Sequence, residues 1–304
     1  MTNSQSNESK TNTDVKPEIK AFFDNETNTF SYIVKDPSSH FCAIIDPVLN
    51  FDYASGAVSF EGAQKIIEYI KHHQLHVEWI IETHVHADHL SAAPYLKDAV
   101  GGKIGIGEHI AIVQNKFGTI FNLDRKFCRN GSQFDYLFKD EEVYSIGNIK
   151  ARAIHTPGHT PACMTHVCGD AAFVGDTLFM PDGGTARADF PGGDACELYQ
   201  SIQKVLSLPP ETRIFVCHDY APNGREVQYE TTVLEERNEN IHVNSSIKEA
   251  DFIKMREARD KTLGMPKLIL PALQTNIRAG NFPDPENNNT VYLKIPLNTL
   301  NKQS

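Results

Sequence analysis

Four polar clusters along the chain carry side chains of the kinds that bind metal ions. The densest is Thr83-His84-Val85-His86-Ala87-Asp88-His89, which puts four candidate ligands within six positions. His84 and His86 are two positions apart, so on an extended segment both imidazoles face the same side. Neutral imidazole and carboxylate together suit first-row metals such as zinc and iron. Repeated histidines at the end of a buried strand have no good packing role, so this run predicts a metal site.

The other three clusters are smaller. His159 follows the turn-forming Thr156-Pro157-Gly158, Asp176 follows Phe173-Val174-Gly175, and His218 follows Val216-Cys217. Taken alone, each has an ordinary explanation: a turn histidine, a capping or ion-paired carboxylate, and a structural histidine. Their joint occurrence with the His84 run predicts that all four clusters share one site.

Each cluster comes at the end of an apolar segment that is typical of a buried strand. The sequence predicts strands over 29–34, 41–46, 77–82, 103–107, 148–154, 164–168, 171–174 and 214–217. It predicts helices over 60–74, 89–100, 109–121 and 194–206, the last with Asp194 as N-cap, and a charged helical stretch over 226–261 with a break near 242–246. From Pro266 onward we expect few regular elements. This order favours an α/β sandwich with sheets inside and helices outside, which presents the clusters along one sheet edge.

The composition narrows the possible functions. The chain has 304 residues, 40% of them hydrophobic, and a net charge of −10, which disfavours nucleic acid and anionic membranes as partners. No apolar run approaches the roughly 20 residues of a membrane span. The six cysteines are scattered, and the first residues lack the apolar centre of a signal peptide, so we expect a cytoplasmic protein. We expect a disordered tail over 1–18 and a single domain over 19–304 with a C-terminal helical and extended extension.

The clusters, in this order, resemble the metallo-β-lactamase superfamily, which implies an αββα sandwich. In binuclear hydrolases of that superfamily the positions of His84, His86 and His159 hold one metal. The positions of Asp88, His89 and His218 hold a second metal, and the position of Asp176 bridges the two.

Several segments further resemble the persulfide dioxygenase branch, which includes bacterial β-lactamase-like hydrolases. They are Ile45-Asp46-Pro47-Val48-Leu49, Gly158-His159-Thr160-Pro161-Ala162-Cys163, Gly175-Asp176-Thr177-Leu178-Phe179, Arg187-Ala188-Asp189-Phe190, His218-Asp219-Tyr220 and Asn276-Ile277-Arg278-Ala279-Gly280. This resemblance implies one iron(II) per subunit, held by His84, His159 and Asp176. The implied reaction oxidises glutathione persulfide with O₂ to sulfite and glutathione.

The resemblance gives the remaining polar groups expected roles. His86, Asp88, His89 and His218 would hydrogen-bond around the iron or hold a second metal. Arg187 and Arg278 are candidates for binding the carboxylates of glutathione, and Tyr220 and Cys163 for lining its site. Ion-paired surface arginines, a packing tyrosine and a buried thiol are the ordinary alternatives.

Other functions stay open at this point. The complete His/Asp set also suits one or two zinc ions in a hydrolase of glutathione thioesters or lactones, similar to glyoxalase II. A third possibility is a metal-binding or redox-sensing protein without catalytic activity, and a true β-lactamase is less expected without a secretory signal. Relatives often form dimers, so we expect a homodimer.

Overall fold

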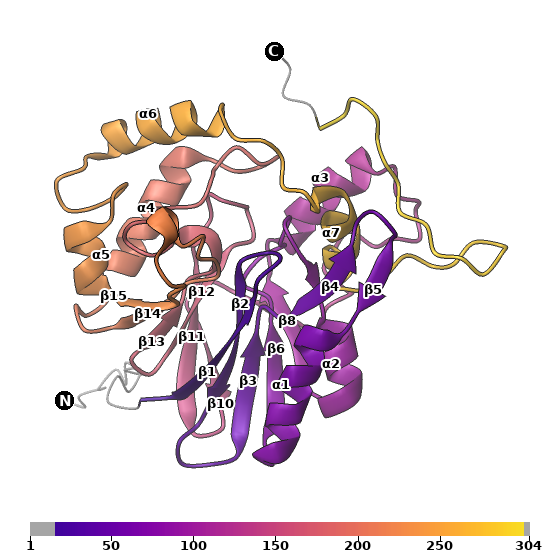
Figure 1. Ribbon diagram of the computed structural model, residues 1–304, viewed down its shortest axis with the longest axis horizontal. Coiled ribbons are helices and arrows are strands. Elements are labelled where there is room, and N and C mark those ends of the chain that lie inside the picture. Colours follow the sequence, from indigo (N-terminus) through magenta and orange to yellow (C-terminus); the bar gives the residue numbers. More distant parts are fainter. Residues whose placement is uncertain (1–15, 301–304) are drawn as a thin grey trace, which may run out of the picture.

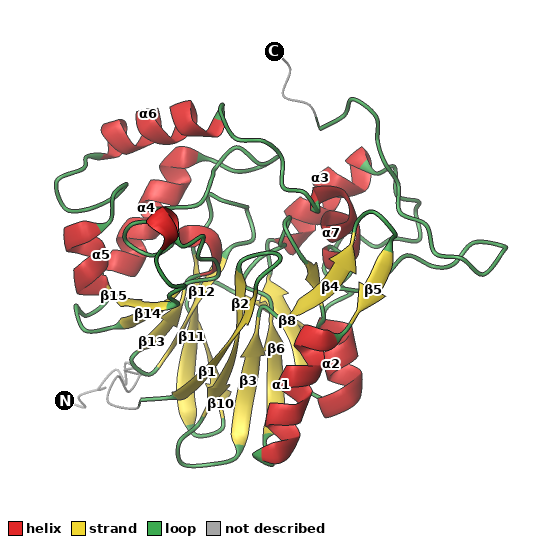
Figure 2. Cartoon of the chain, viewed as in Figure 1, coloured by secondary structure: helices red, strands yellow, loops and turns green. Residues whose placement is uncertain are grey.

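A computed structural model describes residues 16–300 of the chain, so the expected tail lies mostly outside the described residues. Where that tail was expected to end, Glu18 already pairs with Lys35 across the first two strands. Figure 1 shows sheets in the middle of the molecule with helices on both outer sides, and Figure 2 shows the same layers by element type. The αββα sandwich predicted from the sequence is therefore confirmed.

The first sheet comes from the first half of the chain. Its order is β1-β2-β3-β6-β8-β9. The strands are β1 (Glu18–Asp24), β2 (Thr29–Lys35), β3 (Phe41–Ile45), β6 (His76–Ile81), β8 (Lys103–Gly107) and β9 (Tyr136–Phe138). Pairing is antiparallel from β1 to β3 and parallel from β3 to β9.

The second sheet comes from the second half and has the order β10-β11-β12-β13-β14-β15. Its strands are β10 (Glu142–Ile146), β11 (Ile149–His155), β12 (Met164–Cys168), β13 (Ala171–Phe173), β14 (Arg213–Phe215) and β15 (Glu230–Thr232). The hairpin expected across Gly169-Asp170 is present, because β12 and β13 pair in antiparallel register. A three-stranded sheet, β5-β4-β7, adds β4 (Val48–Asp52), β5 (Ala57–Ser59) and β7 (Leu90–Ser91).

Alternation along the strands divides the core into layers. In β2, Ile33 packs toward the helices beside the first sheet, whereas Tyr32 and Val34 face the second sheet. There they meet Phe173 and Phe215, which come from the second sheet. Both sheets are thus buried on two faces, and the layer between them joins the two halves of the chain.

The helices cover the outer faces. Beside the first sheet lie α1 (Glu61–His72), α2 (Ala93–Val100), α3 (Ile110–Ile120) and α7 (Ile269–Asn276). Beside the second sheet lie α4 (Ala195–Leu206), α5 (Val233–Glu239) and α6 (Glu249–Asp260). Asp194 caps α4 as predicted, because its carboxylate accepts the backbone N–H groups of Cys196 and Glu197.

Two expectations about elements need correction. The helix expected over 89–100 begins only at Ala93, because Leu90 and Ser91 pair with β4 and the Ser91 hydroxyl then accepts the Ala93 N–H at 3.0 Å. The charged stretch from 226 contains strand β15 before its first helix. The segment after Pro266 has few regular elements, as expected: among the described residues it contains only α7, whose side chains are almost all buried.

Candidate metal centre

The four polar clusters meet at one edge of the two sheets. His84 follows β6, His159 follows β11, Asp176 lies in a short 3-10 turn after β13, and His218 follows β14. Because the sheets pack face to face, the ends of these strands bring residues from both halves of the chain together. The shared site predicted from the sequence is therefore present as a cluster of side chains.

One group of candidate ligands contains two histidines and one carboxylate. The ligand atoms of His84, His159 and Asp176 all lie within 4.8 Å of one another. Asp176 Oδ2 is 3.8 Å from His84 Nε2 and 3.5 Å from His159 Nε2. All three side chains are buried, so little water competes for these atoms. The three residues predicted to bind the metal are thus adjacent in space, although 92 positions separate the first from the last.

Two glycines allow the chain to pack closely beside the candidate ligands. Gly158 has a φ of +131°, and a Cβ there would lie 2.2 Å from the backbone nitrogen of Leu198 in α4. Gly175 has a φ of +51°, and a Cβ there would lie 2.6 Å from Thr83 Oγ1. Only glycine fits either position without displacement, and each directly precedes a candidate ligand.

Hydrogen bonds fix which ring nitrogen faces the centre of the site. His159 Nδ1 donates to the carbonyl oxygen of Arg187 at 2.8 Å, and His89 Nδ1 donates to that of Leu90 at 3.0 Å. A carbonyl oxygen only accepts, so Nδ1 carries the proton in both rings and Nε2 of the neutral ring presents a lone pair.

His84 is held through a side-chain relay. The Thr83 hydroxyl donates to Asp46 Oδ2 at 2.8 Å, so its oxygen accepts from His84 Nδ1 at 3.0 Å. His86 Nε2 donates to Asp46 Oδ1 at 3.0 Å, which leaves His86 Nδ1 to face the site. Asp46 therefore orients two of the candidate ligands. The sequence singled it out only as part of a motif, although a carboxylate ending a buried strand was the signal used for Asp176.

A second group of ligands adjoins the first. His218 Nε2 lies 3.2 Å from Asp88 Oδ2 and 3.2 Å from Asp176 Oδ1. The two oxygens of Asp176 thus face different histidines: Oδ2 faces His84 and His159, and Oδ1 faces His218. This arrangement resembles a bridging carboxylate, so the second group has the placement that a second metal requires.

Buried atoms without partners show that a metal fits these residues. Within residues 16–300, His84 Nε2, His89 Nε2 and Asp176 Oδ1 are buried and have no hydrogen-bond partner. Such atoms are costly unless a ligand satisfies them. Burial lowers the pKa of His84 well below its usual value and that of His89 to about 4, so both rings are neutral at pH 7 and able to bind a metal.

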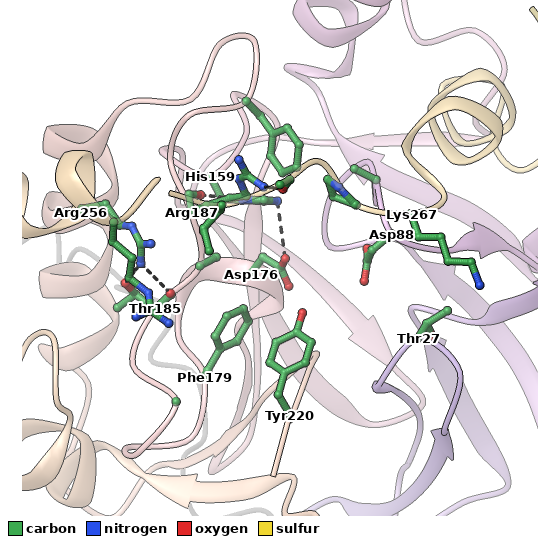
Figure 3. A pocket seen from close by; sticks show the side chains of 18 of the residues that line it. Thr27, Asp88, His159, Asp176, Phe179, Thr185, Arg187, Tyr220, Arg256 and Lys267 are labelled. Atoms are coloured by element: carbon green, nitrogen blue, oxygen red, sulfur yellow. Dashed lines mark hydrogen bonds and ion pairs between the residues drawn. The ribbon is translucent and has the colours of Figure 1, made fainter. Parts of the chain in front are cut away.

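A pocket of about 480 Å³ opens onto this group. Asp88, His159 and Asp176 lie at its inner end, and Phe179 and Tyr220 form one wall (Figure 3). Phe190 packs edge-on against the His159 ring at 5.1 Å between centroids. The site therefore joins a polar inner end to partly apolar walls, as small-molecule sites commonly do.

Two of the four predicted substrate-binding residues line this pocket. Tyr220 is 59% exposed there, next to Phe179. Arg187 also lines it, but its guanidinium donates to both Asp189 oxygens, at 2.6 and 2.9 Å, and to the Gly264 carbonyl oxygen at 2.6 Å. Arg187 thus mainly ties pocket-lining segments together.

The other two predicted substrate-binding residues, Cys163 and Arg278, do not line this pocket. Cys163 is buried against Thr160, whose backbone N–H donates to its sulfur at 3.3 Å, and burial raises the pKa of this thiol to about 12. Arg278 stacks over the Phe127 ring at 4.5 Å. The burial of Cys163 agrees with the ordinary alternative of a buried thiol, whereas Arg278 packs on an aromatic ring and its side chain makes no ion pair within the described residues.

Sequence reasoning missed three cations that line the pocket. Arg256 of α6 is paired with Asp260, and the other two are Arg259 of α6 and Lys267 in the loop after it. Within the described residues, neither the Arg259 nor the Lys267 side chain takes part in a hydrogen bond or ion pair, so both are available to an anionic ligand. The available signal was weak, because Arg259 lies in a charged helical stretch where surface cations are ordinary and Lys267 lies in the segment after Pro266, where few regular elements were expected. None of the helices described between residues 16 and 300 has the length and apolar character of a membrane span.

The chain is similar to one protein family and to several individual proteins. The pattern of the metallo-beta-lactamase superfamily matches residues 24–218. A probable metallo-hydrolase of Burkholderia pseudomallei is 53% identical over 93% of this chain and 99% of its own length. Glyoxylase B2 of Dictyostelium discoideum is 50% identical over 94% of this chain and 98% of its own length. A beta-lactamase hydrolase-like protein of Agrobacterium fabrum is 53% identical, but this chain spans only 65% of that protein.

More distant similarity points to another named activity. The mitochondrial persulfide dioxygenase ETHE1 of Homo sapiens is 29% identical over 86% of this chain and 88% of its own length. The crystal structure of ETHE1 from Myxococcus xanthus superposes with a TM-score of 0.69 at 25% identity, covering 87% of this chain and all of that one. The sequence match over most of the fold, together with the histidine and aspartate cluster at the sheet edge, shows that the chain belongs to the metallo-β-lactamase superfamily.

Proposed function

We propose that this protein is a non-haem iron persulfide dioxygenase. Glutathione persulfide, O₂ and water would give glutathione and sulfite with two protons. The terminal sulfur loses four electrons and forms three bonds to oxygen, the S–S bond breaks, and O₂ accepts the four electrons. Glutathione leaves with a proton on its sulfur.

The observation that carries the proposal is the convergence of His84, His159 and Asp176. Two histidines and one carboxylate are the ligand set of non-haem iron(II) oxygenases. Bound there, iron(II) would supply open coordination positions for both reactants and the electrons that activate O₂. The similarity to persulfide dioxygenases supports this choice.

The chain's own residues have defined tasks in this proposal. Phe179, Phe190 and Tyr220 form walls that limit water around the persulfide sulfur. Arg259 and Lys267 are the cations able to bind the carboxylates of the glutathione part, in place of Arg278. Arg187, through Gly264, keeps the loop before Lys267 beside the pocket.

A second candidate is a binuclear zinc hydrolase of glutathione thioesters or lactones. The observation in its favour is Asp176, whose two oxygens face different groups of histidines. The name of the Dictyostelium relative also fits this activity. In such a site, two metals would supply a hydroxide nucleophile at neutral pH.

One experiment compares the two candidates directly. The protein is purified without oxygen, loaded in parallel with iron(II) or zinc(II), and assayed with glutathione persulfide and with S-lactoylglutathione. The proposal expects equimolar O₂ uptake and sulfite formation by the iron form, with negligible thioester hydrolysis. Oxygen-independent hydrolysis by the zinc form, without O₂ uptake by the iron form, would establish the hydrolase instead.

A further inference from the structure

The peptide unit between Arg187 and Ala188 makes two hydrogen bonds in opposite directions. Its carbonyl oxygen accepts the Nδ1 proton of His159 at 2.8 Å. Its N–H group donates to Oδ2 of Asp260 at 2.9 Å. A single amide thus links a candidate metal ligand of the second sheet to the last residue of helix α6.

Asp260 is itself held firmly. Its Oδ1 accepts from Arg256 Nε at 2.8 Å and lies 2.6 Å from Arg256 Nη2, one helical turn earlier. Arg256 Nη1 also donates to the carbonyl oxygen of Thr185 at 3.0 Å. Both Arg256 and Asp260 are almost completely buried, at 1% and 3% exposure. Burying two charges is costly, so their retention calls for a role beyond filling space.

A fixed carboxylate changes the amide it binds. Negative charge at the N–H end of a peptide polarises the bond, so the carbonyl at the other end becomes a stronger acceptor. A stronger acceptor holds the His159 proton on Nδ1 and leaves the Nε2 lone pair directed at Asp176, 3.5 Å away. Metal-binding histidines are commonly fixed by a carboxylate on the second ring nitrogen, and here a peptide stands between the two groups.

From this geometry we infer that Asp260 is a positioning residue for His159, acting through the Arg187–Ala188 peptide. The other histidines use different supports, since His84 relies on Thr83 and Asp46, and His89 on its neighbour's carbonyl oxygen. Asp260 lies beyond residue 218, where the superfamily match ends. The inference rests only on His159 binding a metal, which both candidate functions share.

The test uses Asp260→Asn in the full chain, because this change removes the charge with little change in shape. Asp251→Asn is the matched control, since Asp251 is exposed in the first turn of the same helix. The metal-free proteins are titrated with zinc(II) against a competing chelator, and the His159 tautomer is read from long-range ¹H–¹⁵N NMR. Metal affinity should fall by about 10- to 100-fold in Asp260→Asn, and the Nε2–H tautomer of His159 should increase. Asp251→Asn should match the wild type in both measurements.

A folded Asp260→Asn protein with unchanged tautomer and affinity within about twofold of the wild type would overturn the inference, as would equal losses in the control. If Asp260→Asn does not fold, Arg256→Lys replaces it, because this change keeps the cation but loosens its grip on Asp260. Arg256→Lys should shift the tautomer in the same direction, and an unchanged tautomer there would again overturn the inference. Neither measurement involves turnover, so failure of the proposed dioxygenase activity would be recognised separately.

Discussion

In the first half of the chain, four candidate ligands lie on one loop, from His84 to His89. In the second half, three candidate ligands lie at the ends of separate strands. The loop follows β6 directly. His159, Asp176 and His218 each depend on a different strand of the second sheet. The group of His84, His159 and Asp176 takes one ligand from the loop and two from the second sheet. The candidate metal centre therefore depends on the packing between the two sheets, because this packing brings the loop ligands beside those of the second sheet.

The histidines of the first group, His84 and His159, also differ in what holds them. Asp46, a side chain, orients His84 through Thr83 and contacts His86 directly. In the second half, backbone holds His159, through the Arg187 carbonyl oxygen. A side-chain support can be removed by one substitution, whereas a backbone support can be altered only through the residues that fix it. The following predictions use this difference, in order of decreasing effect on the centre.

The largest effect is expected from Asp176→Asn, which removes the carboxylate whose oxygens face both groups of histidines. Metal affinity should fall by more than the ~10- to 100-fold that loss of an outer partner costs, and turnover should fall with it. Chelator competition and steady-state assays measure both, and circular dichroism checks folding. Wild-type affinity in this variant would show that the Asp176 carboxylate is not a metal ligand.

Removing the side-chain support should have the next largest effect. In Asp46→Asn, the relay through Thr83 and the contact with His86 both weaken, so metal affinity should fall by about 10- to 100-fold. Asp52→Asn, on the exposed end of β4, is the control. If chelator competition gives the same affinity for both variants, the loop does not need Asp46.

The pocket cations should affect substrate binding and leave the metal in place. Replacing Arg259 and Lys267 together by methionine should raise KM for an anionic substrate by about 10-fold or more, since ~1.4 kcal/mol of binding corresponds to a factor of ten. Lys261→Met is a control, because Lys261 is exposed and does not line the pocket. An unchanged KM would remove Arg259 and Lys267 from the proposed substrate site.

The smallest effect on the centre is expected from Glu236 of α5, whose contribution is to stability. Burial raises the pKa of Glu236 from 4.5 to about 8, so the folded protein keeps a proton that the unfolded chain releases between these values. The free energy of unfolding should therefore decrease as pH rises from 4.5 to 8, by up to about 1.4 kcal/mol per pH unit. In Glu236→Gln this decrease should be absent.

Thermal unfolding at pH 5 and pH 8 measures that difference. Glu239→Gln, an exposed change in the same helix, should behave as the wild type. A Glu236→Gln protein that loses as much stability at pH 8 as the wild type would assign the pH dependence to other groups.

The contrast between one local run of ligands and ligands from separate strand ends explains what could be predicted from the sequence. The His84–His89 run is local, so its chemistry and its strand were readable from spacing, and β8 was predicted with the bounds Lys103–Gly107. To predict that this run lies beside His159, Asp176 and His218, we had to assume that the ends of several strands meet at one sheet edge. The expected role of each ligand came from the resemblance to the metallo-β-lactamase superfamily. The homodimer and the cytoplasmic location stay predictions.

Some tertiary contacts around the site could not be predicted from the sequence. Arg278 was chosen for its motif, but its guanidinium stacks on Phe127 and does not line the pocket. Arg259, in α6, and Lys267, in the loop after it, resemble ordinary surface cations in the sequence, and only the fold places them beside the pocket. The helix expected from His89 starts late because Leu90 pairs with Leu49, a partner 41 positions earlier in the chain.

The most direct test of the account is the metal content of protein purified without oxygen, compared among the wild type, His89→Asn and His159→Asn. If His84, His159 and Asp176 hold a single iron, the wild type and His89→Asn should each contain one iron per chain by plasma mass spectrometry. His159→Asn should contain almost none. Two metals per chain in the wild type, with one lost in His89→Asn, would contradict a mononuclear centre and favour the binuclear hydrolase.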